Sequence, residues 1–411
     1  MPEALQHTIR RMVGRDPSES GRASTPLELL FDLTFVVAFG AAADELAHLV
    51  TDDHVADGII GFCFATFAVS WAWIGFSWFA SAFDTDDWIF RLTTMVQMAG
   101  VLVLALGVPK MFDSLAEGDH VDLQLMVIGY VVMRVPMLFQ WLRAGREDHD
   151  RRAVCRVMIA TLLVAQVGWV LLLLAHPTRG WAFICVGVLI LVEATGPAVA
   201  ESLHDGTPWH GHHIAERYGL MVIIALGEGL LGTTAALGVL IEDGWTLDVV
   251  VLGLAGVALT FGVWWTYFVI PHGDLLTANR ERSFGWGYGH IVLFGAVVAI
   301  GAGLHAAAYF LDDHSGLTAG GTVLTVAAPL AVYVACLYLL YAQISRTLDP
   351  FHFLLIALSG GILALSVGLA WSGVDMVWAI AVLALVPWVT VVGYETVGHR
   401  HNAEVLAELE S

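Results

Sequence analysis

The sequence predicts an all-α integral membrane protein with about twelve transmembrane helices in two parallel six-helix halves. Of its 411 residues, 58% are hydrophobic and only 14% are charged, whereas a soluble domain is about 45–50% apolar and about 25% charged. The mean hydropathy is +0.75. Twelve apolar segments are also of spanning length, since one helical crossing of a bilayer needs roughly 20 residues. Composition and segment length therefore predict the fold class together.

The positions of the positive charges support the same count. The expected spans lie at 27–49, 58–83, 91–109, 122–143, 154–176, 180–202, 214–240, 247–271, 285–311, 318–344, 351–372 and 374–396. If the N-terminus is inside, 15 of the 18 Lys and Arg residues lie on the cytoplasmic side. Only Lys110 and Arg179 fall outside, and Arg134 lies within a span. By the positive-inside rule, this predicts a multi-pass protein of the cell membrane with both termini in the cytoplasm.

The chain divides into five expected parts. They are a cytoplasmic tail at 1–26, a first six-helix repeat at 27–202, a cytoplasmic His-containing linker at 203–213, a second repeat at 214–396 and a cytoplasmic tail at 397–411. The first tail has no apolar stretch, so we expect no cleavable signal peptide. Trp73, Phe76 and Arg91 match Trp264, Tyr267 and Arg282 at one common offset. With six spans per half, the two repeats would be parallel, related by an axis along the membrane normal.

The net charge of −20 argues against a nucleic-acid partner, whose electrostatic footprint on a protein is basic. Acidic residues gather in the expected outer loops. They form either a hydrated rim or a vestibule that attracts cations. The four cysteines lie in or at the ends of apolar spans without metal or disulfide spacing. We therefore expect membrane lipids and a small solute or ion as partners and no cofactor, and the sequence makes no prediction of the oligomeric state.

The first span begins with a helix-start signal. Thr25 and Pro26 suit an N-cap and a first helical position. Glu28 follows in the first turn, where the helix dipole favours an anion, and Asp32 lies one turn deeper on the same face. Glu28 is either a cap-region charge or a functional acid. Asp32 is followed only by apolar residues and Thr34, and therefore indicates a functional acid.

The seventh span carries a carboxylate in the middle of an apolar stretch. Arg217, Met221, Ile224 and Glu228 follow one another at steps of four, three and four, which places them on one helical face. Ionisable groups at that depth are rare and usually face a bundle interior or a wet cavity. Glu228, between two glycines, is therefore a candidate site residue.

The fourth span carries Arg134 near its midpoint. An unpaired guanidinium there would cost from about 2.5 to more than 10 kcal/mol, so it needs a carboxylate partner. The sixth span supplies a candidate in Glu193, which precedes Gly196 and Pro197. Interrupted helices at this depth line cavities in transporters, so we expect the helix to break at this Gly-Pro pair. The alternative is a structural Arg–Glu clamp between helices.

The linker holds four histidines, His204, His210, His212 and His213. Histidine is the commonest metal ligand, but the spacing matches no defined zinc pattern. We interpret the segment as a polar connection and predict no metal site.

Two stretches of the sequence carry specific motifs in addition to their apolar composition. LELLFDLTFVVAF (27–39) and AERYGLMVIIALGE (215–228) resemble the paired signatures of the bacterial low temperature requirement A family, and YGHIVLFGAVVAIGAGL (288–304) is similar to its third recurring segment. The resemblance implies a multi-pass membrane protein linked to growth in the cold, and implies no particular reaction. By residue, the family pattern points to Glu28, Asp32, Glu216, Arg217, Gly227 and Glu228. Gly229 departs from it, because small hydroxyl residues are common there in the family.

These features favour a secondary transporter or permease for a small solute or ion, coupled to protons through buried carboxylates. Its site residues would be Glu28, Asp32, Arg134, Glu193, Glu216, Arg217 and Glu228. The competing class is a membrane enzyme acting on lipid or an isoprenoid carrier, but no nucleophile–base or aspartate-rich motif supports it. A sensor or assembly factor for cold adaptation, without turnover, is the third class.

Overall fold

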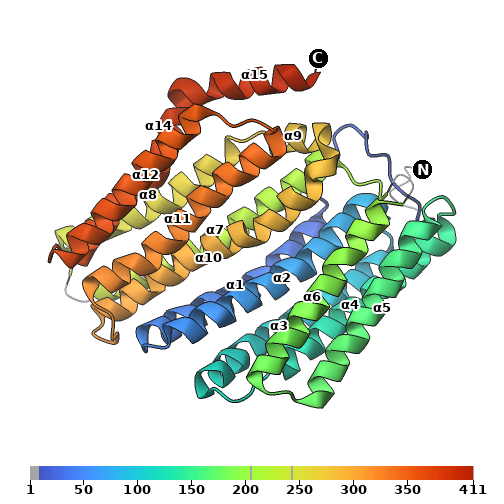
Figure 1. Ribbon diagram of the computed structural model, residues 1–411, viewed down its shortest axis with the longest axis horizontal. Coiled ribbons are helices and arrows are strands. Elements are labelled where there is room, and N and C mark those ends of the chain that lie inside the picture. The colour runs from blue at the N-terminus through green and yellow to red at the C-terminus, as the bar shows by residue number, and fades with distance from the viewer. Residues whose placement is uncertain (1–8, 204–205, 242–243, 411) are drawn as a thin grey trace. The chain divides into compact units, whose positions relative to one another are not determined.

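The computed structural model describes residues 9–203, 206–241 and 244–410. These residues form helices and short connections and include no strand (Figure 1). Within them, twelve helices are long and apolar enough to cross a membrane. The prediction of an all-α protein with twelve spans is therefore confirmed.

The helices run in the following order. They are α1 (Pro26–Thr51), α2 (Val55–Phe83), α3 (Trp88–Glu117), α4 (Gln124–Glu147), α5 (Arg152–Ala175), α6 (Arg179–Glu201), α7 (Gly211–Ile241), α8 (Leu247–Phe268), α9 (His272–Ala278), the 3-10 turn η2 (Arg280–Arg282), α10 (Ser283–Leu311), α11 (Ala319–Ser345), α12 (Pro350–Trp371), α13 (Met376–Leu383), α14 (Val386–Gly393), the π-helical turn η3 (Tyr394–Gly398) and α15 (His399–Glu410). The last span thus combines α13, α14, η3 and most of α15.

Two expectations about helix ends and breaks are wrong. The third span was expected to end at residue 109, but α3 continues through Pro109 and Lys110 to Glu117. Polar residues can continue a helix beyond its apolar stretch, because exposed turns keep their internal hydrogen bonds. The expected break in α6 is also absent, and Pro197 lies inside a continuous helix. A proline removes one backbone donor, and in a membrane bundle neighbouring groups can compensate for that loss.

The chain forms two compact units. The first comprises residues Met1–Ala41 and Trp71–Arg217, and the second Ala42–Ser70 and Tyr218–Ser411. Helices α1, α2 and α7 therefore each contribute to both units. The internal repeat stays a prediction, because compactness reports packing and not similarity between halves.

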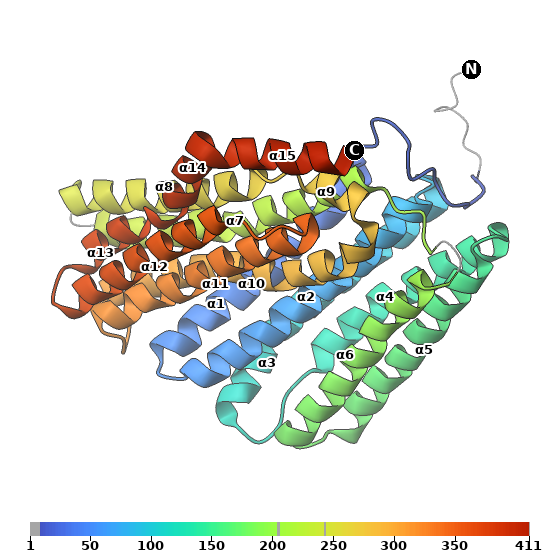
Figure 2. The ribbon, with the colours of Figure 1, turned by 45° about the horizontal axis from the view of Figure 1, so that its top comes forward.

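Helices that follow one another in the sequence pack together in both units, and in the second unit α8 also packs with α13 and α14. In the first unit α3 packs along α4, α4 along α5 and α5 along α6 (Figure 2). In the second unit α10 and α11 run side by side, and α12 packs on α11. The chain turns sharply after α14, so that α15 runs across the direction of that helix (Figure 1). Helix α15 contacts α9 at this end of the second unit.

Residues 9–25, which we call the N-terminal strap, are tied to the first unit. The backbone N–H of Gly14 donates to Asp148 at 2.8 Å, and that of Arg15 donates to the carbonyl of Ala82 at 2.9 Å. The side chain of Met12 is completely buried. The segment expected to be a cytoplasmic tail thus packs against the first unit from residue 9 onwards.

Candidate functional site

A buried ion network joins the start of α1 to the start of α7 in the first unit. The Arg217 guanidinium donates through Nε to Asp32 Oδ2 at 2.9 Å and through Nη2 to Asp32 Oδ1. Its Nη1 donates to Glu28 Oε1 at 3.0 Å. All three side chains are buried. A two-point arginine–carboxylate fork of this kind combines charge with fixed geometry, and is among the stronger hydrogen-bonded pairs in proteins.

The local sequence at Thr25 positions the Glu28 carboxylate. The Thr25 N–H donates to Glu28 Oε2 at 2.8 Å, and the Glu28 N–H donates to Thr25 Oγ1 at 3.3 Å. This reciprocal pair is a capping box, which satisfies donors that a helix start otherwise leaves free. The expected N-cap and the ion-pair role of Glu28 therefore occur together, since the same carboxylate also meets Arg217.

Two further donors complete this network. The Trp73 indole Nε1 donates to Asp32 Oδ1 at 2.6 Å. The imidazole Nε2 of His213, one turn before Arg217 on α7, lies 3.2 Å from Glu28 Oε1. Sequence reasoning assigned His213 to the linker and missed Trp73 as a donor. The available signal was the four-residue spacing of His213 and Arg217, which places both on one face.

A second buried cluster surrounds Glu193 of α6. Its carboxylate accepts from Trp71 Nε1 at 2.6 Å, from Trp169 Nε1 at 2.7 Å and from the Tyr130 hydroxyl. Arg134 Nη2 lies 3.7 Å from the same carboxylate and donates to the Tyr130 hydroxyl at 2.7 Å. The cluster thus ties α2, α4, α5 and α6 together within the first unit. The structure brings the predicted partners Arg134 and Glu193 together, and adds three aromatic donors.

Two of the other linker and family residues, Glu216 and His210, contact the N-terminal strap. Glu216 is exposed, and its carboxylate accepts from the Ser24 N–H at 3.2 Å. His210 Nε2 contacts the Glu19 carbonyl at 2.9 Å, and His204 lies outside the described residues. The linker segment from residue 206 to His210 is buried, and α7 begins earlier than expected, at Gly211. In the described part of the chain, no group of three or more His, Cys, Asp or Glu side chains could hold a metal ion.

Glu228 of α7, in the second unit, differs from the other buried acids. It is 2% exposed, and among the described residues no hydrogen bond or ion pair reaches its carboxylate. The backbone of α10 lies directly against it, since a Cβ built at Gly301 would come 2.6 Å from Glu228 Cβ. On the α8 side, a Cβ at Gly229 would come 2.9 Å from Thr260 Oγ1. The neighbouring helices therefore enclose Glu228 without supplying a cation.

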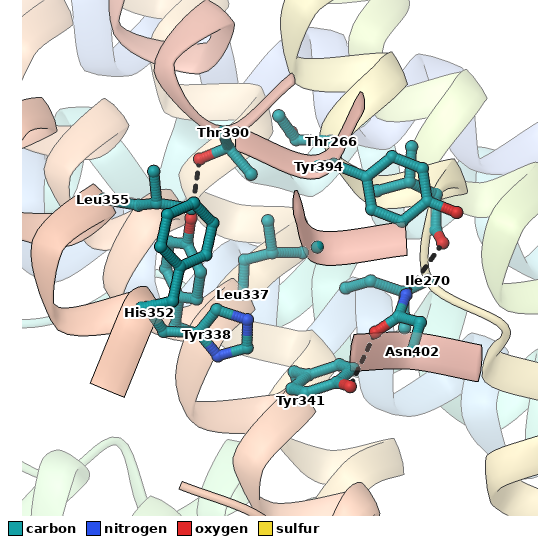
Figure 3. Close-up of a pocket in the computed structure, with 13 residues that line it drawn as sticks. Thr266, Ile270, Leu337, Tyr338, Tyr341, His352, Leu355, Thr390, Tyr394 and Asn402 are labelled. Atoms are coloured by element: carbon teal, nitrogen blue, oxygen red, sulfur yellow. Dashed lines mark hydrogen bonds between the residues drawn. The ribbon is translucent and has the colours of Figure 1, made fainter. Parts of the chain in front are cut away.

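One pocket of the second unit is lined by aromatic and polar side chains near α14 and α15 (Figure 3). Its volume is about 40 Å³, enough for a few water molecules at about 10–15 Å³ each. The Tyr341 hydroxyl donates to Asn402 at 2.6 Å, and the hydroxyls of Tyr338 and Thr390 lie 2.8 Å apart. None of the seven candidate residues lines this pocket.

A larger cavity of about 560 Å³ lies in the first unit, at the ends of α3 and α5. Glu117, Asp119, Asp122, His120 and His176 are among its lining residues. Two of the acids expected in the outer loops, Glu117 and Asp119, therefore border one hollow. The choice between a hydrated rim and a vestibule that attracts cations stays a prediction.

The twelve apolar helices among the described residues, with their buried ionisable clusters, define a polytopic membrane protein. The chain belongs to the bacterial low temperature requirement A protein (LtrA) family, whose sequence profile matches residues 23–387. It is also 27% identical over 321 residues to the uncharacterized protein RA0937 of Rhizobium meliloti (strain 1021). This alignment covers 74% of this chain and 73% of that protein. No solved structure matches the chain. The expected family is therefore confirmed, and all seven candidate residues lie within the matched range.

Proposed function

We propose that the protein is a secondary transporter or permease of the cell membrane that couples the movement of a small solute or ion to a proton carried by Glu228. The observation that carries this proposal is the isolation of the Glu228 carboxylate, which is buried and has no cationic partner among the described residues. A buried charge without a partner costs several kcal/mol or more, so such a group binds a proton or a cation.

The other buried acids serve as a contrast. Asp32 accepts two hydrogen bonds from Arg217 and one from Trp73, and Glu193 has three aromatic donors and a nearby arginine. A carboxylate that accepts this many hydrogen bonds is stabilised in its charged form, and breaking these bonds costs free energy. We assign these two clusters to the framework that holds the helices, and Glu228 to the exchange of protons.

The proposed orientation and biological role rest on sequence. The distribution of Lys and Arg supports a protein of the cell membrane with both termini in the cytoplasm. The family name links its members to growth at low temperature. We propose that the transported solute or ion contributes to growth in the cold.

The test is transport by the full-length protein in liposomes that contain a pH-sensitive dye. Gradients of sodium, potassium, ammonium, amino acids and small organic acids are imposed in turn. At least one gradient is expected to change the internal pH with the wild-type protein, and Glu228→Gln is expected to abolish that change. The matched control is Glu395→Gln, because Glu395 is an exposed glutamate in η3.

Two results would overturn the proposal. In one, Glu228→Gln moves protons as the wild type does. In the other, no gradient moves protons through the wild-type protein while it remains folded in the liposomes. Retention of the wild-type response by Glu395→Gln is required for the first comparison to count.

A further inference from the structure

A stripe of residues on α10 leads away from Glu228. Gly301, His305 and Tyr309 follow at intervals of four and therefore lie on one face of this helix. Gly301 lies against Glu228, as described above. A Cβ at Gly232, one turn beyond Glu228 on α7, would come 3.1 Å from the backbone nitrogen of His305. Helices α7 and α10 thus stay in close contact from the level of Glu228 to the level of His305.

A second stripe, on the last part of α1, faces the first. Asp44 and His48 are four residues apart. The Asp44 carboxylate lies 3.9 Å from His305 Nδ1, and His48 Nε2 lies 3.1 Å from the Tyr309 hydroxyl. Both stripes belong to the second unit. They form two consecutive pairs of ionisable groups between Glu228 and the ends of the two helices.

Exposure falls along this series. The side chain of Asp44 is 57% exposed and that of His305 is 16% exposed, whereas Glu228 is 2% exposed. His305 Nε2 is buried and has no hydrogen-bond partner in the described part of the chain. One ring nitrogen of His305 therefore faces the exposed Asp44, while the other has its hydrogen-bonding capacity free inside the protein.

We infer that Asp44 and His305, with His48 and Tyr309 beyond them, form a path by which protons reach Glu228 from the α1–α2 end of the second unit. This inference rests on the proposed proton exchange at Glu228 and adds its route. Imidazole suits the task because it can accept a proton at one nitrogen and donate one from the other. The proton enters at Nδ1 beside Asp44, the proton on Nε2 leaves towards Glu228, and the ring returns to neutrality.

One water molecule is needed for the last step. Four residues of an α-helix span about 6 Å, so His305 lies about that far along α10 from the level of Glu228. A water-mediated hydrogen bond bridges such a gap without a large energetic penalty. The water accepts a proton from Nε2 and gives one to the Glu228 carboxylate, so that only protons change position.

The charged surroundings favour proton entry at this end. Asp44 lies 3.9 Å from His305 Nδ1. Glu45 follows Asp44 on α1, and Asp52 comes directly after this helix. The acids outnumber the two histidines in this group, and a negative potential raises the local concentration of protons.

The experiment follows the protonation of Glu228 directly and does not depend on an identified solute. Full-length protein in liposomes receives a rapid downward pH step, and time-resolved infrared spectroscopy records the C=O stretch of the protonated carboxyl. The band is assigned to Glu228 by its absence in Glu228→Gln. His305→Ala and Asp44→Asn are each expected to slow its appearance about tenfold or more, which corresponds to about 1.4 kcal/mol in the barrier.

The controls separate the path from general damage. His314→Ala removes an exposed histidine of the loop after α10 and is expected to keep the wild-type rate. Added imidazole is expected to restore the rate in His305→Ala, which a misfolded variant would not allow. Asp44 is exposed, so Asp44→Asn tests the path without altering the core.

The outcomes distinguish the two proposals. Wild-type rates in both His305→Ala and Asp44→Asn would overturn the path and leave proton exchange at Glu228 standing. Absence of the Glu228 band in the wild type at every pH would overturn both. A slow rate in both variants, with an unchanged final band, is the result that supports the path.

Discussion

Gly75 of α2 gives the Arg134 guanidinium the space that it occupies. A Cβ built at Gly75 would come 2.6 Å from Arg134 Nη1, closer than any ordinary contact. Arg134 is buried and held beside Glu193 and Tyr130, so a shift of its guanidinium would disturb these contacts. A residue without a side chain in one helix is therefore a condition for the buried charge in another.

Gly75→Ala is expected to destabilise the protein by about 1–3 kcal/mol, because the added methyl group must displace a buried, hydrogen-bonded guanidinium. The measurement is the midpoint of thermal unfolding in detergent. Gly360→Ala in α12 is the matched control, since nothing lies within 4 Å of a Cβ at that position. An unchanged midpoint for Gly75→Ala would show that Arg134 adjusts without loss.

Arg217→Lys should lower stability although it retains the positive charge. A lysine cannot form the two-point contact that Arg217 makes with Asp32, and it cannot reach Glu28 at the same time. We expect a loss of about 1.5–3 kcal/mol, the value of a hydrogen bond to a charged group. Arg346→Lys, at a half-exposed ion pair with Glu281, should change the unfolding midpoint little. Equal effects of the two substitutions would contradict the importance of the fork.

Parts of the candidate site could be predicted because the chemistry demands them. An arginine in the middle of an apolar span needs a carboxylate, and Arg134 does lie 3.7 Å from Glu193. The donors Trp71 and Trp169 could not be identified in the same way. Aromatic residues fill many cores, and only the orientation of the indole N–H makes them ligands of a carboxylate.

The fold likewise has features that the sequence predicts and features that it does not. Twelve spans follow from hydropathy, which is a property of each segment alone. The N-terminal strap is held by hydrogen bonds from Gly14 to Asp148 and from Arg15 to Ala82, which are far apart in the sequence. The strap is polar and has no periodic hydrophobic pattern from which these contacts could be predicted. The lack of a cationic partner for Glu228 among the described residues could not be predicted either, because it depends on which side chains α8 and α10 place beside it.

Asp84, in the connection between α2 and α3, should make stability depend on pH. Burial raises the pKa of this carboxyl to about 6, and the charge of Glu28 is the second cause of the increase. The folded state then holds a proton that the unfolded state has lost, so stability is highest below the ordinary pKa and falls as the pH rises towards 6. Asp84→Asn is expected to raise the free energy of unfolding at neutral pH by up to about 3 kcal/mol, and to flatten this pH dependence.

The check is a series of thermal unfolding midpoints in detergent between acidic and neutral pH. The amide oxygen that Asp84→Asn introduces can still accept from the Asp86 N–H, a bond of 2.8 Å in the native protein, so the turn is preserved. Asp150→Asn serves as control, because Asp150 is an exposed aspartate in the connection between α4 and α5. A pH profile of Asp84→Asn parallel to that of the wild type would assign the dependence to another group.

Tyr341→Phe should loosen α15 from the end of the second unit. The Tyr341 hydroxyl donates to Asn402 at 2.6 Å across the small pocket beside α15 (Figure 3). Loss of one such bond is worth about 1 kcal/mol, so amide hydrogen exchange in α15 is expected to become about fivefold faster. Tyr394→Phe is the control: Tyr394 lines the same pocket, and no hydrogen bond to its hydroxyl occurs among the described residues. Exchange in α15 that is equally fast in both variants, or unchanged in Tyr341→Phe, would show that the bond to Asn402 does not hold the helix. The other contacts of α15, among them the one between His401 and Asp349, would then hold it.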